Sequence, residues 1–354
     1  MTTTTATTGS ATPPEAPSKS AARPRRRLRR VLTWVAAVLG VLVLVLGGLA
    51  WWLLWTPAPK KPDLAATVTT RAITVDGRVR HYVEVVPDDV PDDAPLWVVL
   101  HGSNNTIGQI RRYTGYRMDE LAVEKGFVLV YAEGYGKTWH DCRTATPYAA
   151  RRDGVDDVHF LQELVGTVTT QHHLDTSRVF GFGYSNGSHM LYRMAAESPG
   201  TFAGIAVNAA NLPADSNTEC GPITSPVPVM MVEGTGDPIN PYDGGQAGAF
   251  GQHLGKVRSA QDSARILAGV DGDSGTPATT LVGGKAGAKG SVTLTEYGAG
   301  TSHPVRLYTV EGGGHAVPNP VARMPRIMGG STTHLDSPET AVDFFAGLAA
   351  KNHD

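Results

Sequence analysis

The sequence predicts an α/β domain whose mostly parallel sheet is covered by helices on both faces. Continuous apolar runs, which are typical of buried central strands, alternate along the chain with helical patterns. A strand-like stretch at 177–182 leads into the glycine-framed turn 183–187, and a helical pattern follows at 188–197. From residue 67 onwards the chain has about 290 residues, which suits a single domain of this kind.

The expected elements follow that alternation. A hairpin is expected at 68–75 and 79–86, because both segments alternate apolar and polar residues on either side of Asp76-Gly77. Further strands are expected at 96–100, 127–131, 177–182, 204–207, 227–232 and 307–310, and helices at 116–125, 158–168, 188–197 and 338–350. Asp156 and Asp157 provide an N-cap and an acidic first turn for the helix at 158–168. The Gly-, Ser-, Thr- and Ala-rich segment 271–302 is expected to be a loose excursion with one strand at 292–297.

Charge is spread unevenly along the chain. Residues 1–66 hold nine of the 31 Lys and Arg but two of the 33 Asp and Glu, so residues 67–354 carry 22 basic and 31 acidic side chains, a net charge of −9. An acidic domain is a poor electrostatic partner for nucleic acid. We therefore expect no polynucleotide as partner or substrate.

The N-terminal part predicts a membrane anchor. Residues 1–30, rich in Thr, Ser, Ala and Pro and ending in an arginine cluster, are expected to form a disordered basic cytoplasmic tail. Residues 31–55 carry no charge and suffice to cross the ~30 Å core of a bilayer, with tryptophans near both ends. Because the arginines precede this span, the Pro-rich stalk 56–66 and the domain 67–354 are expected outside the cytoplasm.

A cleaved signal peptide is the alternative to an anchor. Its apolar region is normally ~7–15 residues long and is followed by a small-residue cleavage site. Here the apolar run is longer and ends in Trp-Trp-Leu-Leu-Trp, and Ala58 lies between two prolines. These features favour an uncleaved, single-pass anchor.

Cys142 and Cys220 are the two cysteines of the chain. In an exported domain such a pair favours a disulfide, and two buried free thiols are the alternative. Two cysteines without histidine help do not make a structural zinc site, so no metal is expected.

The turn 183–187 reads Gly-Tyr-Ser-Asn-Gly and fits the pattern G-x-S-x-G. Between a strand and a helix, this pattern is the setting of a nucleophile elbow, a sharp turn that projects a serine hydroxyl from the top of a sheet. Gly183 and Gly187 lack the Cβ atoms that would clash in such a turn. The alternative is a glycine-rich turn with an incidental serine, but the flanking strand and helix favour Ser185 as a nucleophile.

A serine nucleophile needs a base, and the base needs a partner that holds its tautomer. In the α/β-hydrolase order the acid follows the serine and the histidine comes last. Asp237 is the first acid just beyond an apolar strand downstream of Ser185, whereas Glu233, the alternative, lies within that strand's end. His315 follows a strand through three glycines, which would let a mobile loop bring the imidazole over Ser185. Two other downstream histidines lack this setting: His303 and His334.

Acyl transfer also needs donors for the developing oxyanion. The backbone N–H of Asn186, directly after the serine, is one expected donor, and the second should come from the loop after the strand 96–100. We assign it to Ser103, with Asn104 as the alternative. His101 is expected to prop this loop rather than to act as a second base.

The chain from Val83 to Phe345 resembles the secreted esterases related to poly(3-hydroxybutyrate) depolymerases and feruloyl esterases. The resemblance is carried by the Ser-Asn-Gly elbow, the Gly-Thr-x-Asp-Pro loop of Asp237 and the Gly-Gly-Gly-His loop of His315. The matching segments are 100–103, 127–134, 139–143, 155–158, 183–187, 234–242 and 312–315. It implies the α/β-hydrolase fold, ester hydrolysis with the same three catalytic residues, and no cofactor or metal.

This chain departs from the family's usual pattern at two places. It has Ala-Val-Pro at 316–318 where a Trp-Pro pair is usual, and Trp-His-Asp at 139–141 where Trp-Asn-Asp is usual. Both positions are expected near the acyl pocket. Trp139 and Tyr184 are candidate substrate-binding residues, and a core position is the alternative for Trp139.

The expected substrates are carboxylic esters, either hydroxyalkanoate oligomers or aryl and acetyl esters. Two other functions compete with this interpretation. One is a serine peptidase of the same fold, which would need an extended peptide site. The other is a non-catalytic cell-surface binding module on a hydrolase scaffold.

Overall fold

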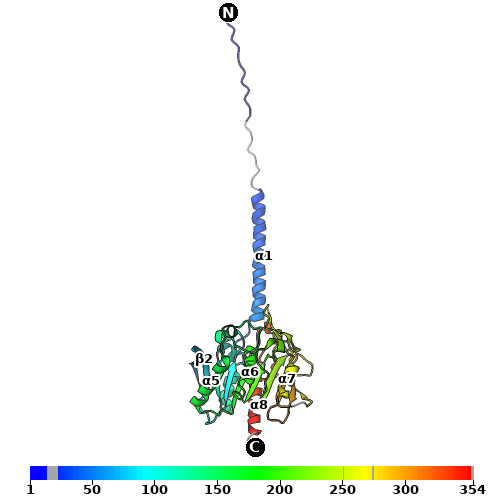
Figure 1. The fold of residues 1–354 in the computed structure, drawn as a ribbon. Helices are drawn as coiled ribbons and strands as arrows, with labels where there is room; N and C mark the ends of the chain where they lie inside the picture. The colour runs from blue at the N-terminus through cyan, green and yellow to red at the C-terminus, as the bar shows by residue number, and fades with distance from the viewer. Residues whose placement is uncertain (14–22, 250, 273–274, 352–354) are drawn as a thin grey trace. The chain divides into compact units, whose positions relative to one another are not determined.

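The computed structural model describes residues 1–13, 23–249, 251–272 and 275–351, and it divides the chain into two units, Met1–Leu53 and Leu54–Asp354 (Figure 1). Residues 1–13 of the first unit form neither helix nor strand, and the helix α1 runs over Arg23–Leu54. Its part Arg26–Leu54 is long and apolar enough to cross a membrane. Residues 14–22 of the expected disordered tail lie outside the described residues. The expectation is wrong for residues 23–30, which form the first turns of α1.

A ten-stranded sheet forms the centre of the second unit, in the order β1-β2-β4-β3-β5-β6-β7-β12-β11-β10. The strands from β4 to β12 in this order run parallel, and antiparallel strands extend the sheet at both edges. The strands are β1 (Ala66–Val75), β2 (Arg78–Pro87), β3 (Leu96–Leu100), β4 (Val128–Ala132), β5 (Val179–Tyr184), β6 (Gly204–Asn208), β7 (Val229–Gly234), β10 (Ala278–Gly283), β11 (Val292–Tyr297) and β12 (Val305–Val310). A separate short pair joins β8 (Gly245–Gln246) to β9 (Lys256–Val257).

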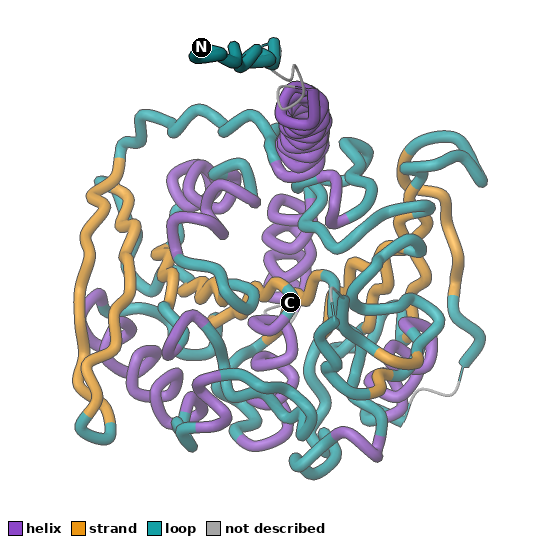
Figure 2. Tube along the Cα trace, turned by 90° about the horizontal axis from the view of Figure 1, so that it is seen from above, coloured by secondary structure: helices purple, strands orange, loops and turns teal. Residues whose placement is uncertain are grey.

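Helices cover both faces of this sheet (Figure 2). They are α2 (Ile107–Tyr113), α3 (Arg117–Lys125), α4 (Ala149–Arg152), α5 (Asp157–His172), α6 (Asn186–Glu197), α7 (Ala260–Gly269) and α8 (Ser337–Lys351). Because side chains alternate across a strand, Leu96 and Val98 pack in one core with α5, α6 and α7, whereas Trp97 and Val99 pack in the other with α3 and α8. Two cores, one on each face, therefore clamp the central strands.

The structure confirms the predicted α/β architecture and most of its elements. The helix α5 begins where the sequence indicates, and the side chain of Asp156 caps it by accepting a hydrogen bond from the N–H of His159 at 2.9 Å. The strand predicted at 292–297 is β11. The helices α2 and α7 were not predicted, although Thr106 and Gln109 form a capping box at the start of α2.

The expectation of a loose excursion at 271–302 is wrong in one respect. The segment holds a second strand, β10, which pairs antiparallel with β11 at the edge of the sheet. Its side chains are almost all exposed, so the strand has no apolar alternation from which it could be predicted. Pairing with β11, rather than burial of a face, accounts for its strand conformation.

Cys142 and Cys220 form a disulfide, as one of the two sequence alternatives predicts. The same two segments are also joined through the backbone, because the N–H of Glu219 donates to the carbonyl of Cys142 at 2.9 Å. The bridge therefore fastens the loop that follows β4 to the segment that follows β6.

Candidate active site

Ser185 lies in the turn between β5 and α6, with φ 53° and ψ −116°, a conformation that residues with a side chain rarely adopt. The glycines on either side are required by space. A Cβ on Gly183 would lie 2.6 Å from the Cα of Ser188, and a Cβ on Gly187 would lie 2.3 Å from the carbonyl oxygen of Leu100. The glycines thus let α6 begin directly against the end of β3, and the turn is the elbow that the motif predicts.

Asn208, at the end of the neighbouring strand β6, braces this strained turn. Its carbonyl accepts from the N–H of Ser185 at 2.9 Å, and its side-chain amide donates to the carbonyl of Gly183 at 3.0 Å. Its own N–H donates to the hydroxyl of Ser188 at 2.9 Å. The sequence did not predict this role of Asn208, although an asparagine at the carboxyl end of an apolar run is visible in it.

A continuous chain of hydrogen bonds joins Ser185, His315 and Asp237. The Ser185 hydroxyl lies 2.8 Å from Nε2 of His315, and Nδ1 of His315 lies 2.7 Å from Oδ2 of Asp237. The other carboxylate oxygen of Asp237 accepts from the N–H groups of Ile239 and Asn240 at 2.7 and 2.8 Å. Both oxygens of the carboxylate are therefore engaged, which fixes its orientation towards the imidazole.

The loop that carries His315 is fastened on two sides. The N–H of His315 donates to the carbonyl of Met328 at 2.7 Å, and the carbonyl of Gly313 accepts from the N–H of Gly236 at 2.8 Å. A Cβ on Gly314 would lie 2.1 Å from the Met328 carbonyl oxygen. The glycines here permit close approach between backbones, a role that the sequence did not indicate.

Glu233, the alternative acid, does not contact His315. It is buried, and its oxygens accept from the N–H of Ala210 at 2.9 Å and from the side-chain amide of Asn240 at 3.3 Å. Burial, with a smaller contribution from the charge of Asp237, raises the pKa of Glu233 well above its ordinary value. The geometry therefore brings Asp237, not Glu233, to the histidine.

The loop after β3 passes beside Ser185. The N–H of Asn104 already donates to the carbonyl of Lys137 at 2.8 Å, whereas no hydrogen bond within the described residues engages the N–H of Ser103. On the other side of the serine, Asn186 opens α6, where the first N–H groups have no carbonyl of the helix to bond. Between the two sequence alternatives, the geometry favours Ser103 over Asn104 as a free donor.

His101 supports this loop from below. It is fully buried, its Nε2 accepts from the N–H of Gly134 at 3.0 Å, and its Nδ1 lies 2.7 Å from the carbonyl oxygen of Gly102. This arrangement places the proton of the neutral ring on Nδ1. Burial lowers the pKa of His101 from 6.5 to about 4. His101 is thus a neutral prop near pH 7, as the sequence predicts.

A cavity of about 290 Å³ opens beside the Ser185 hydroxyl. Its lining includes three tyrosines, Tyr113, Tyr148 and Tyr184, and the amide side chains of Asn104, Asn105 and Gln252. Apart from His315, none of the described residues that line the cavity is acidic or basic. The cavity therefore suits an uncharged ligand with both apolar and hydrogen-bonding surface.

The two predicted substrate-binding residues differ in position. Tyr184 lines the cavity, and its hydroxyl donates to the carbonyl of His315 at 3.1 Å. Trp139 does not line it, and its expected place in the pocket wall is wrong. The indole is fully buried, stacks on Phe160 and donates through Nε1 to the carbonyl of His101 at 2.9 Å. This position is the core alternative, and it arises because the indole N–H finds its partner inside the domain.

The fold and this site together define a hydrolase of the α/β-hydrolase fold. The comparisons agree with that class. The family model described as esterase PHB depolymerase matches residues 81–245. The chain is 31% identical over 306 residues to the protein named "Putative esterase NocK" of Nocardia uniformis subsp. tsuyamanensis. The aligned region covers 83% of this chain and 87% of that protein.

Two further matches are more remote. Poly(3-hydroxyalkanoate) depolymerase C of Paucimonas lemoignei is 30% identical over 122 residues, covering 34% of this chain and 29% of that protein. The solved structure of acetyl xylan esterase from Aspergillus awamori has the same fold, with a TM-score of 0.50 and 18% identity over 71% of this chain and 95% of that one. The chain belongs to the esterase PHB depolymerase family, as the resemblance predicted, and it is a carboxylic ester hydrolase.

We expect the buried His101 to make stability depend on pH. Its pKa is lower in the folded state than the ordinary value of an unfolded chain, so the unfolded chain binds the proton first as the pH falls. The contribution of neutral, buried His101 to the free energy of unfolding is complete above about pH 7 and is lost as the pH falls from about 6.5 to 4. Between pH 7 and 5 the free energy of unfolding should fall by about 2 kcal/mol on account of this residue. Urea unfolding of wild type and His101→Gln measures it, and an equal pH dependence in both proteins would contradict the assignment.

Proposed function

We propose that this protein is an extracytoplasmic serine esterase that works through an acyl-enzyme. Ser185 is the nucleophile, His315 is the general base and then the general acid, and Asp237 orients His315. The observation that carries the proposal is the unbroken chain of short hydrogen bonds from the Ser185 hydroxyl through the imidazole to the Asp237 carboxylate. It ends at an uncharged cavity large enough for a small ester.

In the acylation step the Ser185 oxygen attacks the ester carbonyl carbon while its proton passes to Nε2 of His315. Asp237 stabilises the resulting imidazolium and keeps the proton on Nδ1 directed towards itself. When the tetrahedral intermediate collapses, the carbon–oxygen bond to the alcohol breaks and His315 protonates the leaving oxygen. Water then attacks the acyl carbon while its proton passes to Nε2 of His315. When this second intermediate collapses, the bond between the acyl carbon and the Ser185 oxygen breaks, His315 returns the proton to that oxygen, and the acid is released.

The oxyanion of each intermediate is stabilised by the backbone N–H groups of Ser103 and Asn186. This assignment rests on three observations: Asn186 directly follows the nucleophile at the start of α6, Ser103 lines the same cavity as Ser185, and the Asn104 N–H is engaged elsewhere. Donors that are fixed before the reaction cost no reorganisation when the charge develops. The start of α6 adds the positive end of a helix dipole on the same side.

The proposed substrates are neutral esters, either hydroxyalkanoate oligomers or aryl and acetyl esters. The tyrosines and amides of the cavity favour acyl or alcohol groups that carry rings or hydroxyls, and Tyr184 contributes to its wall. Substrates with a free carboxylate or ammonium beside the scissile bond would find no Asp, Glu, Lys or Arg among the described residues of the lining. Esters of hydroxyalkanoate and acetyl type also appear in the names of the relatives described above.

We place the catalytic domain, residues 67–354, outside the cytoplasm. Residues 31–55 would act as a single-pass signal anchor, with 1–30 as a cytoplasmic tail and 56–66 as a stalk. The apolar helix within α1 supports this arrangement, and so does the Cys142–Cys220 disulfide, because such bonds persist in oxidising compartments.

Replacing the nucleophile tests the mechanism. Ser185→Ala should lower kcat for p-nitrophenyl acetate by at least about a thousandfold, because water in the site cannot replace the activated hydroxyl. The fold should persist, since alanine fits wherever serine does. The matched control Ser177→Ala, at an exposed serine before β5, should keep wild-type activity. A Ser185→Ala enzyme with more than about a tenth of wild-type kcat would sink the assignment.

The identity of the acid is tested by two conservative substitutions. Asp237→Asn should reduce kcat by about 10⁴-fold, because an amide can hold the imidazole in the wrong tautomer. Glu233→Gln should leave kcat within about threefold, because Glu233 does not contact His315 and its oxygens bond Ala210 and Asn240 instead. The reverse order of the two losses would assign the acid to Glu233.

The anchor makes a prediction for the mature protein. N-terminal sequencing of material purified from the membrane fraction of the native host should find a terminus that precedes residue 31. The length of the apolar run and its bulky end are the physical reason. A terminus after about residue 56 would instead identify a cleaved signal peptide.

A further inference from the structure

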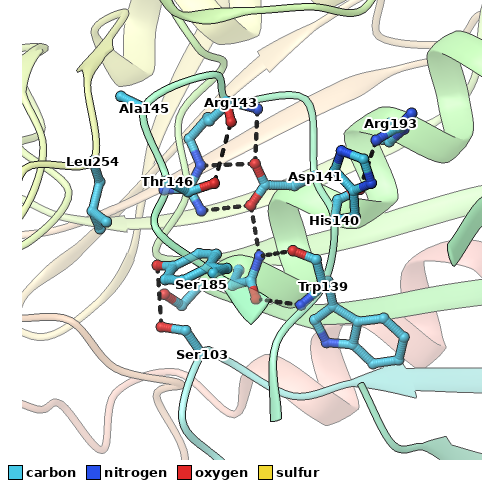
Figure 3. A network of polar contacts seen from close by, with 12 residues as sticks. Ser103, Trp139, His140, Asp141, Arg143, Ala145, Thr146, Ser185, Arg193 and Leu254 are labelled. Atoms are coloured by element: carbon cyan, nitrogen blue, oxygen red, sulfur yellow. Dashed lines mark hydrogen bonds and ion pairs between the residues drawn. The ribbon is translucent and has the colours of Figure 1, made fainter. Parts of the chain in front are cut away.

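A buried ion pair lies directly behind the active site (Figure 3). One oxygen of Asp141 accepts from the N–H and Nε of Arg143 at 2.8 and 3.1 Å, and the other accepts from Nη2 at 2.6 Å. Burial alone would raise the pKa of Asp141, but the Arg143 guanidinium more than offsets it and leaves the pKa below its ordinary value. The pair is therefore ionised. It belongs neither to the triad nor to the cavity lining.

The ion pair is linked to one proposed oxyanion donor, Asn186, through the side chain of that residue. The amide nitrogen of Asn186 donates to Oδ2 of Asp141 at 2.6 Å and to the carbonyl of Trp139 at 3.1 Å. The amide oxygen of Asn186 accepts from the N–H of Trp139 at 2.8 Å. Three hydrogen bonds thus fix the side chain of the residue whose backbone N–H is one proposed oxyanion donor.

The ion pair is also linked to Ser103, the residue that provides the other proposed oxyanion donor. The guanidinium of Arg143 lies 5.7 Å from the ring centroid of Tyr148, within the range of a cation–π contact. The hydroxyl of Tyr148 donates to the hydroxyl of Ser103 at 3.2 Å. One buried pair is therefore connected to both residues whose backbone amides are the proposed oxyanion donors.

The surrounding backbone keeps this unit in place. Cys142 lies between Asp141 and Arg143 and is bonded to Cys220. Arg143 also forms an isolated antiparallel bridge with Thr218. The disulfide thus fastens the loop that carries the ion pair to a second segment of the domain.

We propose that Asp141 and Arg143 form a positioning unit that sets the oxyanion donors, chiefly through the side chain of Asn186. This inference rests on the function proposed above. Neither residue touches substrate, so both act through Asn186 and Tyr148. Fixing the Asn186 side chain fixes the first residue of α6 and with it the direction of its N–H. Because that N–H binds the oxyanion more strongly than the ground-state carbonyl, the unit should affect kcat rather than KM.

A double-mutant cycle on the full-length, detergent-solubilised protein tests the proposal with p-nitrophenyl acetate as substrate. Asp141→Asn and Asn186→Ala should each lower kcat about ten- to a hundredfold, with KM within about threefold. The kcat of the double variant should be no lower than that of the less active single variant, because both substitutions break the same linkage. Inhibition by phenylboronic acid, which forms a tetrahedral serine adduct, should weaken in parallel with kcat/KM.

The matched control is Asp119→Asn. Asp119 is also fully buried and bonded to an arginine and a hydroxyl, through Arg111 Nε at 2.9 Å and Tyr131 at 2.6 Å, but it has no contact with the site. This variant should lower the melting temperature and leave kcat unchanged. A purely structural role for Asp141 would make it behave like Asp119.

The outcomes separate this proposal from the proposed function. Wild-type kcat in folded Asn186→Ala, or multiplicative losses in the double variant, would overturn the positioning unit. Asn186→Ala decides alone if Asp141→Asn does not fold, since it leaves the ion pair intact. Ser185→Ala serves as the reference, and activity in that variant would instead overturn the serine mechanism.

Discussion

The passage of the backbone between β5 and α6 is the constraint on which the rest of the site depends. Ser185 adopts a positive φ there because the chain must turn from a buried strand into a helix within one residue. Only glycine fits at 183 and 187, where the backbones of Ser188 and Leu100 approach to distances that exclude a Cβ. Asn208 of β6 offsets part of the strain by bonding the turn from both ends. Strain of this kind persists only where the surroundings over-determine it.

The parallel centre of the sheet explains why residues far apart in sequence meet. The strands β3, β5, β7 and β12 run in the same direction, so their carboxyl ends share one edge of the sheet. The loops that leave these ends carry Ser103, Ser185, Asp237 and His315 respectively. Ligands bind at such edges in open α/β sheets. Backbone contacts between the loops of Asp237 and His315 then turn proximity into a defined hydrogen-bond geometry.

Much of this arrangement could be predicted from the sequence because local patterns carry it. Apolar strands, the glycine-framed serine and the order of acid and histidine are local signals, and the structure brings Ser185, Asp237 and His315 together. What could not be predicted depends on contacts between distant segments. The indole of Trp139 lies in the core, where it donates to the His101 carbonyl, and this partner lies on another loop that the local sequence does not reveal. The strand β10 formed by pairing with β11 rather than by burial, and the linkage from Asp141 to Asn186 spans 45 residues.

The central claim is that Ser185 alone is an activated nucleophile. Labelling of the native protein with a fluorophosphonate, followed by peptide mass spectrometry, tests it most directly, because the reagent reacts with serines that are activated by a base. We expect one stoichiometric adduct on the peptide that contains Ser185, and no adduct in Ser185→Ala. An adduct on another serine would show that Ser185 is not the nucleophile. Native protein that stays unlabelled while folded would favour a non-catalytic binding module.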